Sequence, residues 1–195
     1  TLCPQIRYAY AADLFERKEY RAASEEYAKI DRKSLYKAQV DEFLFRQAYC
    51  ELELGNTAAA TDIFVELSSR PVTGFTAPSQ YILGYVKYQI NDFHSALSWF
   101  EKAVTDTRFA ENASWYIMEC RFMLKDYNYV TANADKMYES VPADRKPHLA
   151  RIISESYLVM GDAESARKYY DLNPSDKASR SRADWFYSGS LLYAV

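Results

Sequence analysis

Glycine, proline, cysteine and histidine are all scarce in this chain of 195 residues, which contains 5 Gly, 6 Pro, 3 Cys and 2 His. Few glycines and prolines leave long stretches free to form helices. His94 and His148 lie far apart, and no spacing of His or Cys suits a zinc site. No glycine-rich loop of the phosphate-binding kind occurs either. We therefore expect no catalytic residue, no metal and no cofactor.

The chain also lacks a basic excess and a long apolar run. Its formal net charge is -3 and its pI is about 5.5, whereas a nucleic-acid surface needs a stripe of Lys and Arg. No segment approaches the roughly 20 apolar residues needed to cross a bilayer, and no secretory leader is present. Because the sequence starts at Thr1 and not at Met, we expect a trimmed or processed chain, and the missing leader says nothing about its compartment. We expect no nucleic-acid partner and no membrane span.

A short helical hairpin centred on alanine recurs along the chain, most clearly in residues 80–104, QYILGYVKYQINDFHSALSWFEKAV. Aligning the copies on the turn between their two helices places equivalent turn residues 34 to 37 positions apart. These turn residues are Lys18, Gly55, Asn91, Lys125 and Gly161. A period of this length predicts a solenoid of stacked helical hairpins.

Small residues recur at two offsets of the hairpin, one in each helix. The first helices carry Ala11, Ala48, Gly84, Met118 and Ser154, and the second helices carry Ala23, Ala60, Ala96, Val130 and Ala166. Four positions later come Tyr27, Phe64, Phe100, Ala134 and Tyr170. Small side chains let two helix backbones cross closely, and a ring one turn later fills the space beside them. Beside the turn glycines, Thr57 and Asp162 are predicted to cap the second helices.

The hairpin resembles the tetratricopeptide repeat (TPR), and the resemblance covers nearly the whole chain. It is carried by Leu83, Gly84, Phe93, Ala96, Phe100 and Ala103, and again by Trp185 and Gly189. Thr57 and Ala163 depart from the family pattern, which has an aromatic residue after the turn, and Lys87 stands where Tyr or Leu is usual. Val130 and Ala134 make the fourth copy irregular. These departures put local packing in doubt and leave the fold unaffected.

The resemblance implies an all-α, right-handed superhelical solenoid of five full hairpins. A sixth begins with Trp185, Gly189 and Leu192, and the sequence ends at Val195 before its turn. Because stacked hairpins share a continuous core, we predict a single domain over residues 1–195, as part of a longer chain. Residues 30–130 also resemble long multi-repeat TPR proteins of bacterial cell envelopes, which favours a periplasmic or envelope location.

The cysteines favour the alternative, a cytoplasmic location. Cys50 and Cys120 hold the same offset in copies two and four, where a small buried residue is expected. Two repeats of about 10 Å each exceed the roughly 7 Å between Cα atoms that a disulfide allows. We therefore expect free thiols, which are typical of a reducing compartment.

In TPR proteins the first helices face a concave groove, so the resemblance implies which residues would line it. A groove of rings suits an extended peptide or an amphipathic helix. The offset of Tyr88 and Phe122 is also where hairpins pack, so packing is the alternative role there. The candidate residues are Tyr8, Phe45, Tyr49, Tyr81, Tyr85, Tyr88, Trp115, Glu119, Phe122, Arg151 and Phe186.

The family's best-known groove chemistry is a clamp of Lys, Arg and Asn that grips the C-terminal carboxylate of a chaperone. The corresponding offsets here hold Tyr8, Ala12, Phe45 and Tyr49, so we expect no such docking. The first hypothesis is a non-catalytic scaffold that binds a protein or peptide partner of unknown identity. The alternatives are a glycan platform built on the same rings, and an architectural or self-assembly segment of a longer solenoid.

Overall fold

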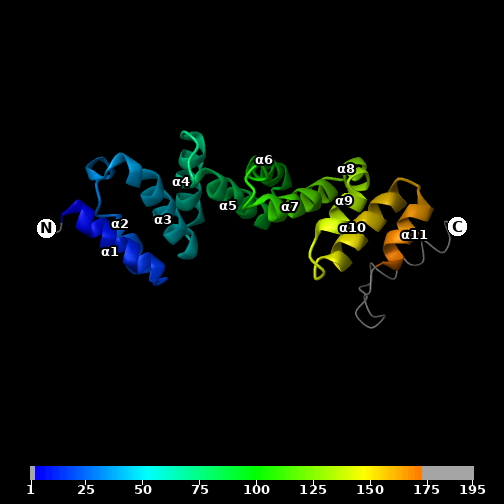
Figure 1. The fold of residues 1–195 in the computed structure, drawn as a ribbon, viewed down its shortest axis with the longest axis horizontal. Coiled ribbons are helices and arrows are strands. Elements are labelled where there is room, and N and C mark those ends of the chain that lie inside the picture. The colour runs from blue at the N-terminus through cyan, green and yellow to red at the C-terminus, as the bar shows by residue number, and fades with distance from the viewer. Residues whose placement is uncertain (1–2, 173–195) are drawn as a thin grey trace. The chain divides into compact units, whose positions relative to one another are not determined.

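The computed structural model describes residues 3–172, and all secondary structure within that range is helical (Figure 1). Paired helices form five consecutive hairpins. The sixth copy, with Trp185, Phe186 and Gly189, lies outside the described residues. The helices are α1 (Pro4–Glu16), α2 (Tyr20–Tyr27), α3 (Val40–Glu53), α4 (Thr57–Ser69), α5 (Thr76–Gln89), α6 (Phe93–Ala103), α7 (Ala110–Met123), α8 (Tyr127–Ala132), α9 (Ala134–Ser140), α10 (Lys146–Val159) and α11 (Ala163–Asp171), with 3₁₀ turns at Arg32–Ser34 and Lys37–Gln39.

The chain divides into two compact units, which are described separately. Unit 1 is residues 1–109 and holds the hairpins α1–α2, α3–α4 and α5–α6. Unit 2 is residues 110–195, and its described part holds α7 with α8 and α9, followed by α10–α11. The single domain over residues 1–195 stays a prediction.

The five turn residues chosen by alignment are the ones with left-handed backbone in the described chain. Their φ angles are 61° at Lys18, 83° at Gly55, 60° at Asn91, 62° at Lys125 and 83° at Gly161. In each turn the next residue donates its N–H to a carbonyl five residues back, as Asn56 does to Glu51 at 2.8 Å. This bond closes a Schellman motif and ends the first helix. The predicted register of the hairpins is therefore confirmed.

The residue after each turn residue begins the next helix as its N-cap. Asp92, Asp126 and Asp162 accept hydrogen bonds from the backbone N–H three residues later, at 3.2, 3.2 and 3.0 Å. The cap predicted at Asp162 is confirmed. The one predicted at Thr57 is wrong, because Thr57 is already the first helical residue and Asn56 occupies the cap position.

The small residues lie where the two helices of a hairpin cross. A Cβ atom added to Gly84 would come within 2.8 Å of the Phe100 ring, so only glycine leaves room for that ring. In the fifth hairpin the buried Ser154 hydroxyl donates to the carbonyl oxygen of Ala166 at 2.8 Å. Both observations confirm the predicted close crossing. In the fifth hairpin the ring that is almost fully buried belongs to Tyr169, at 2% exposure, and not to the aligned Tyr170.

The fourth hairpin is irregular, as its sequence indicated. Its second helix is interrupted at Asn133, which separates α8 from α9 and has φ -108°. The Asn133 side chain donates to the carbonyl oxygen of Tyr129 at 2.9 Å, and Thr131 donates to that of Tyr127 at 2.9 Å. Side chains that bond the preceding turn compete with helical hydrogen bonds and bend a helix.

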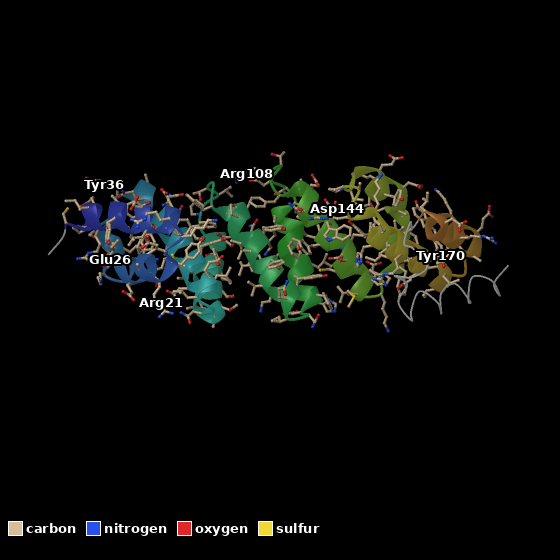
Figure 2. All side chains as sticks on the ribbon, turned by 90° about the horizontal axis from the view of Figure 1, so that it is seen from below. Arg21, Glu26, Tyr36, Arg108, Asp144 and Tyr170 are labelled. Atoms are coloured by element: carbon tan, nitrogen blue, oxygen red, sulfur yellow. The ribbon has the colours of Figure 1, made fainter. Side chains whose placement is uncertain are left out.

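Loops between neighbouring hairpins are tied by long side chains. Arg108, labelled in Figure 2, donates to the carbonyl oxygen of Gly74 at 3.2 Å and pairs with Asp106 at 2.8 Å. Hydrogen bonds from Arg108 lower the pKa of Asp106 to about 2. This contact joins the loop that precedes α5 to the last residues of unit 1.

Candidate partner-binding surface

Five rings of unit 1 contact one another in an unbroken series, which we call the aromatic ladder. It consists of Tyr20, Phe15, Tyr49, Phe45 and Phe75, all of which are half-buried. The ring centroids of Phe15, Tyr20 and Tyr49 are mutually 5.7 to 5.8 Å apart. Phe45 follows at 6.3 Å from Tyr49, and Phe75 at 5.4 Å from Phe45. The ladder thus spans all three hairpins of unit 1.

Regular helix geometry places these rings. Phe45 and Tyr49 are one turn apart on α3 and therefore lie on one face. Phe15 is the last residue but one of α1, and Tyr20 begins α2 just after the left-handed turn, so the turn brings their rings together edge to face. Phe75 stands immediately before α5 and reaches back to Phe45.

A single guanidinium supports the ladder from its side. Arg46 is 18% exposed and lies over the Phe15 ring at 5.2 Å. It pairs with Glu42 at 2.7 Å and Glu16 at 3.0 Å, and it donates to the carbonyl oxygen of Ala12 at 3.3 Å. These partners hold the guanidinium against the ring, where a cation–π contact adds to the packing.

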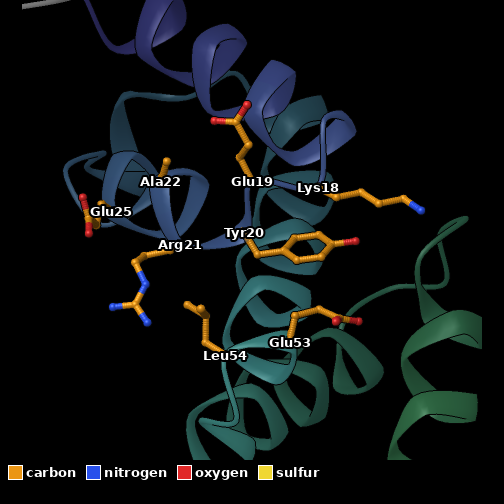
Figure 3. A pocket seen from close by; sticks show the side chains of 8 residues that line it. All are labelled: Lys18, Glu19, Tyr20, Arg21, Ala22, Glu25, Glu53 and Leu54. Carbon is orange, nitrogen blue, oxygen red and sulfur yellow. The ribbon is translucent and has the colours of Figure 1, made fainter.

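At the end of the ladder formed by Tyr20 and Tyr49, hydroxyl and carboxylate groups accompany the rings. Burial raises the pKa of Tyr49, and the neighbouring Glu53 carboxylate raises it further. Both therefore favour a neutral Tyr49 that can donate a hydrogen bond. The Tyr20 ring lies beside Glu53 (Figure 3), so this end combines apolar ring surface with polar groups.

The structure distinguishes among the candidate residues of unit 1. Phe45 and Tyr49 belong to the ladder. Tyr8 is only 8% exposed and packs on Tyr27 with ring centroids 6.4 Å apart, so the expectation of an exposed groove ring is corrected at this position. Burial, with a contribution from Glu42, raises the pKa of Tyr8 to about 12.

The remaining candidates of unit 1 lie on α5. Tyr81 is half-buried, with its ring 5.2 Å from Phe109. Tyr85 is the most open of them, at 40% exposure. Tyr88 meets Phe93 edge to face at 5.6 Å across the turn of its own hairpin, which is the packing alternative considered from the sequence.

In α7 of unit 2 the corresponding offsets hold Trp115 and Glu119. Trp115 is 8% exposed and lies beneath the Arg145 guanidinium, 5.2 Å from its ring, and beneath the His148 ring at 5.5 Å. The expectation of an exposed Trp115 ring is therefore also corrected. The His148 Nε2 atom is 2.9 Å from an oxygen of Glu119, which is 9% exposed.

The fifth hairpin repeats this polar arrangement. Arg151 pairs with Glu155 at 2.8 Å, and Glu155 is 7% exposed. In the fourth hairpin, Phe122 packs against Tyr127 at 6.1 Å across the turn, just as Phe15 packs against Tyr20 in unit 1. At the offsets where α3 carries ring surface, α10 therefore carries paired charges. Phe186 lies outside the described residues.

One set of contact residues was missed from the sequence. Phe75, Phe109 and Arg145 each stand nine positions before the small residue of the following hairpin. Each covers the ring of the preceding hairpin, in the pairs Phe45 with Phe75, Tyr81 with Phe109, and Trp115 with Arg145. Extending the alignment into the loops would have shown the constant offset, because loop residues at helix entries recur as regularly as helical ones.

An open pocket of about 530 Å³ adjoins the ladder at Tyr20 (Figure 3). It lies between the start of α2 and the end of α3. Two cations and three carboxylates line it together with Tyr20, Ala22 and Leu54; the charged residues are Lys18, Arg21, Glu19, Glu25 and Glu53. This nearly balanced charge does not favour a strongly charged ligand.

Comparisons with known proteins identify the fold. No family model matches the sequence, and no curated protein matches it significantly. Solved structures are similar, among them MamA AMB-1, at 14% identity and a TM-score of 0.70, and a mutant of MamA, at 13% and 0.69. Each alignment covers 93% of this chain and 98% of the other. The fold is a TPR-like helical solenoid. At such low identity the likeness concerns the fold alone.

The described residues offer little for a metal site, a membrane span or a reactive thiol. Among residues 3–172, no group of His, Cys, Asp and Glu could hold a metal ion, and no helix is long and apolar enough to cross a membrane. Cys3, Cys50 and Cys120 are free thiols. Burial raises the pKa of Cys50 and of Cys120 to about 12, so both stay protonated and unreactive at neutral pH.

Proposed function

We propose that this chain is a non-catalytic scaffold that binds a peptide or protein partner on the aromatic ladder of unit 1. The observation that carries the proposal is the unbroken series of five half-buried rings. Rings that already contact one another keep their positions when a partner binds, so little side-chain entropy is lost. Tyrosine also offers a hydroxyl at the edge of its apolar surface.

The arrangement of the rings favours binding of a peptide with apolar side chains over binding of a sugar. Phe15 and Tyr20 meet each other edge to face, and Phe45 stacks on Tyr49 with an interplanar angle of 29°, so part of each face is covered by the next ring. A sugar stacks on a whole exposed face, whereas apolar side chains of a peptide fit into the recesses between tilted rings. The likeness to MamA supports a scaffold role at the level of fold only.

The proposal is tested by affinity capture from the native organism with the intact gene product. Proteins retained by the wild type are identified, and the dissociation constant of the main one is measured by calorimetry. Phe45→Ala with Tyr49→Ala should weaken binding by about tenfold or more, because two contact rings are lost. Tyr36→Ala is the matched control, since Tyr36 is 67% exposed and lies outside the ladder.

The experiment must distinguish unfolding of a variant from loss of its contacts with the partner. The helical circular dichroism signal and the melting temperature are recorded for each variant, and a double variant that has lost helical signal is replaced by Tyr49→Ser alone. Equal affinity of a folded ladder variant and of the Tyr36 control would refute the ladder as the binding surface.

A further inference from the structure

One carboxylate beside the aromatic ladder, that of Glu53, has no cation paired with it. Other carboxylates nearby are neutralised within the chain, since Glu16 pairs with Arg46 at 3.0 Å and Glu19 pairs with Arg17 at 2.5 Å. Glu53 is exposed at the end of α3, and no Lys or Arg among residues 3–172 forms an ion pair with it. A cation of a bound partner therefore has access to it.

Two tyrosine rings of the ladder adjoin this carboxylate. The Tyr20 ring lies beside Glu53 in the pocket between α2 and α3 (Figure 3), and its centroid is 5.8 Å from that of Tyr49. Burial raises the pKa of both tyrosines, and the Glu53 carboxylate raises both further, so its charge lies near both rings. The face of an aromatic ring attracts a cation, so rings and carboxylate favour the same sign of ligand charge.

The two cations that line the pocket are not held in it. Lys18 and Arg21 are exposed, and neither forms an ion pair or a hydrogen bond from its side chain within the described part of the chain. Such long side chains turn toward water at little cost when a ligand enters. Ala22 and Leu54 line the pocket between the charged groups and give apolar surface to the aliphatic part of an entering lysine or arginine.

The next pair of hairpins in unit 1 lacks this combination of ring and carboxylate. At the offset of Tyr20 it carries Thr57, and at the offset of Glu53 it carries Gln89. These hairpins also stack, through α4 and α5. Stacking therefore requires neither a ring nor a carboxylate at these offsets, and their presence between α2 and α3 calls for another explanation.

We propose that the partner bound on the aromatic ladder presents a lysine or arginine that pairs with Glu53 against the Tyr20 ring, next to apolar side chains that contact the other rings. The inference rests on the function proposed above and adds the charge of the partner at one end of the ladder. The charge complementarity comes from Glu53, and the ring adds a cation–π contact. An acidic side chain at the same place would be repelled by the carboxylate and by the ring face.

The probe is a peptide selected on the full chain from a phage-displayed library of random sequences. A length of about 12 residues, at about 3.3 Å per residue in an extended conformation, is enough to pass all five rings. Binders that use the ladder are those that no longer bind after Phe45→Ala with Tyr49→Ala. Compared with the unselected library, their sequences should be enriched in Lys or Arg beside aromatic or aliphatic residues.

The tightest binder is then synthesised with a fluorescent label in three versions. One keeps its cation, and in the others that residue is replaced by norleucine, which has a similar aliphatic chain, or by glutamate. Anisotropy titrations should show the cationic peptide binding about fivefold tighter than the norleucine peptide and more than about tenfold tighter than the glutamate peptide.

Variants of the chain locate the contact. Glu53→Gln should remove most of the advantage of the cationic peptide and leave the affinity of the norleucine peptide almost unchanged. Tyr20→Leu should reduce that advantage as well, because the ring face is lost while apolar bulk is kept. Asp62→Asn is the matched control and should change nothing, since Asp62 is an exposed carboxylate of α4 without an ion pair in the described chain.

The outcomes distinguish failure of this inference from failure of the function on which it rests. Peptides that need the ladder but show no enrichment in Lys or Arg would overturn the inference alone, as would a norleucine peptide that binds as tightly as the cationic one. Equal effects of Glu53→Gln and Asp62→Asn would also overturn it, because the preference would then reflect overall charge. If no selected peptide depends on Phe45 and Tyr49, both proposals are refuted.

Discussion

Units 1 and 2 are built from the same hairpin, but the first helices of each present different chemistry. In unit 1 the offsets around the small residue of α3 carry Phe45 and Tyr49, which continue into a ladder of rings. In unit 2 the equivalent offsets of α10 carry Arg151 and Glu155, which pair with each other. The comparison shows that the residues that make the hairpins cross are independent of those that decide the chemistry of the exposed surface.

The helix crossing within a hairpin should be the feature whose substitution lowers stability most. Ala96 is 0% exposed where α6 crosses α5, so Ala96→Leu should overpack unit 1 and lower the free energy of unfolding by about 1 to 3 kcal/mol. Urea unfolding measures the change. Ala59→Leu, on the exposed side of α4, is the control and should be almost neutral. No loss of stability in Ala96→Leu would show that the register of the crossing is wrong.

Unit 2 should be destabilised by the loss of a cation that pairs with a buried carboxylate. Arg151→Ala leaves Glu155 buried without its cation and should lower the free energy of unfolding by about 1 to 2 kcal/mol. Adding Glu155→Gln should recover much of the loss, which a double-mutant cycle measures. If Glu155→Gln restores nothing, the pair contributes little to unit 2.

Turn residues should behave alike in both units. Lys18 in unit 1 and Lys125 in unit 2 have φ near 60°, which costs a residue with a Cβ atom more than it costs glycine. Lys18→Gly and Lys125→Gly should each raise the free energy of unfolding by about 0.5 to 1 kcal/mol. Gly55→Ala, at an equivalent turn, should have the opposite sign. A stabilised Lys18 variant with an unchanged Lys125 variant would reveal a difference between the units.

The smallest effect concerns pH and should also be common to both units. Hydrogen bonds from Ser95 and Ser165 lower the pKa of the capping residues Asp92 and Asp162, and Arg108 lowers that of Asp106 to about 2. Carboxylates with lowered pKa stabilise the folded state above their ordinary pKa, near 3.8, and this contribution is lost as pH falls toward 2. Asp92→Asn should flatten the pH dependence of the melting temperature between pH 4 and pH 2. An unchanged slope would contradict this.

Local features of the fold were predictable because they depend on neighbouring residues. A small residue at the crossing and a left-handed residue at the turn are needed in each hairpin, so they recur with the period. The break at Asn133 and the burial of Tyr169 in place of Tyr170 were not predicted in detail, because competing side-chain hydrogen bonds and packing decide them.

The candidate site was only partly predictable. The offset rule placed Phe45 and Tyr49 on one surface, but it treated Tyr8 and Trp115 as equivalent to them. Their burial is decided by what covers each ring, Tyr27 in one case and Arg145 with His148 in the other.

The sequence by itself determined the hairpin, its register, its turns and its close crossings, because each depends on residues within one repeat or its immediate neighbour. Only the tertiary structure decided which rings join into a ladder and which carboxylates are buried. Those properties depend on contacts between hairpins, where the partner of a side chain lies about 30 residues away and its size and charge are not specified by the repeat.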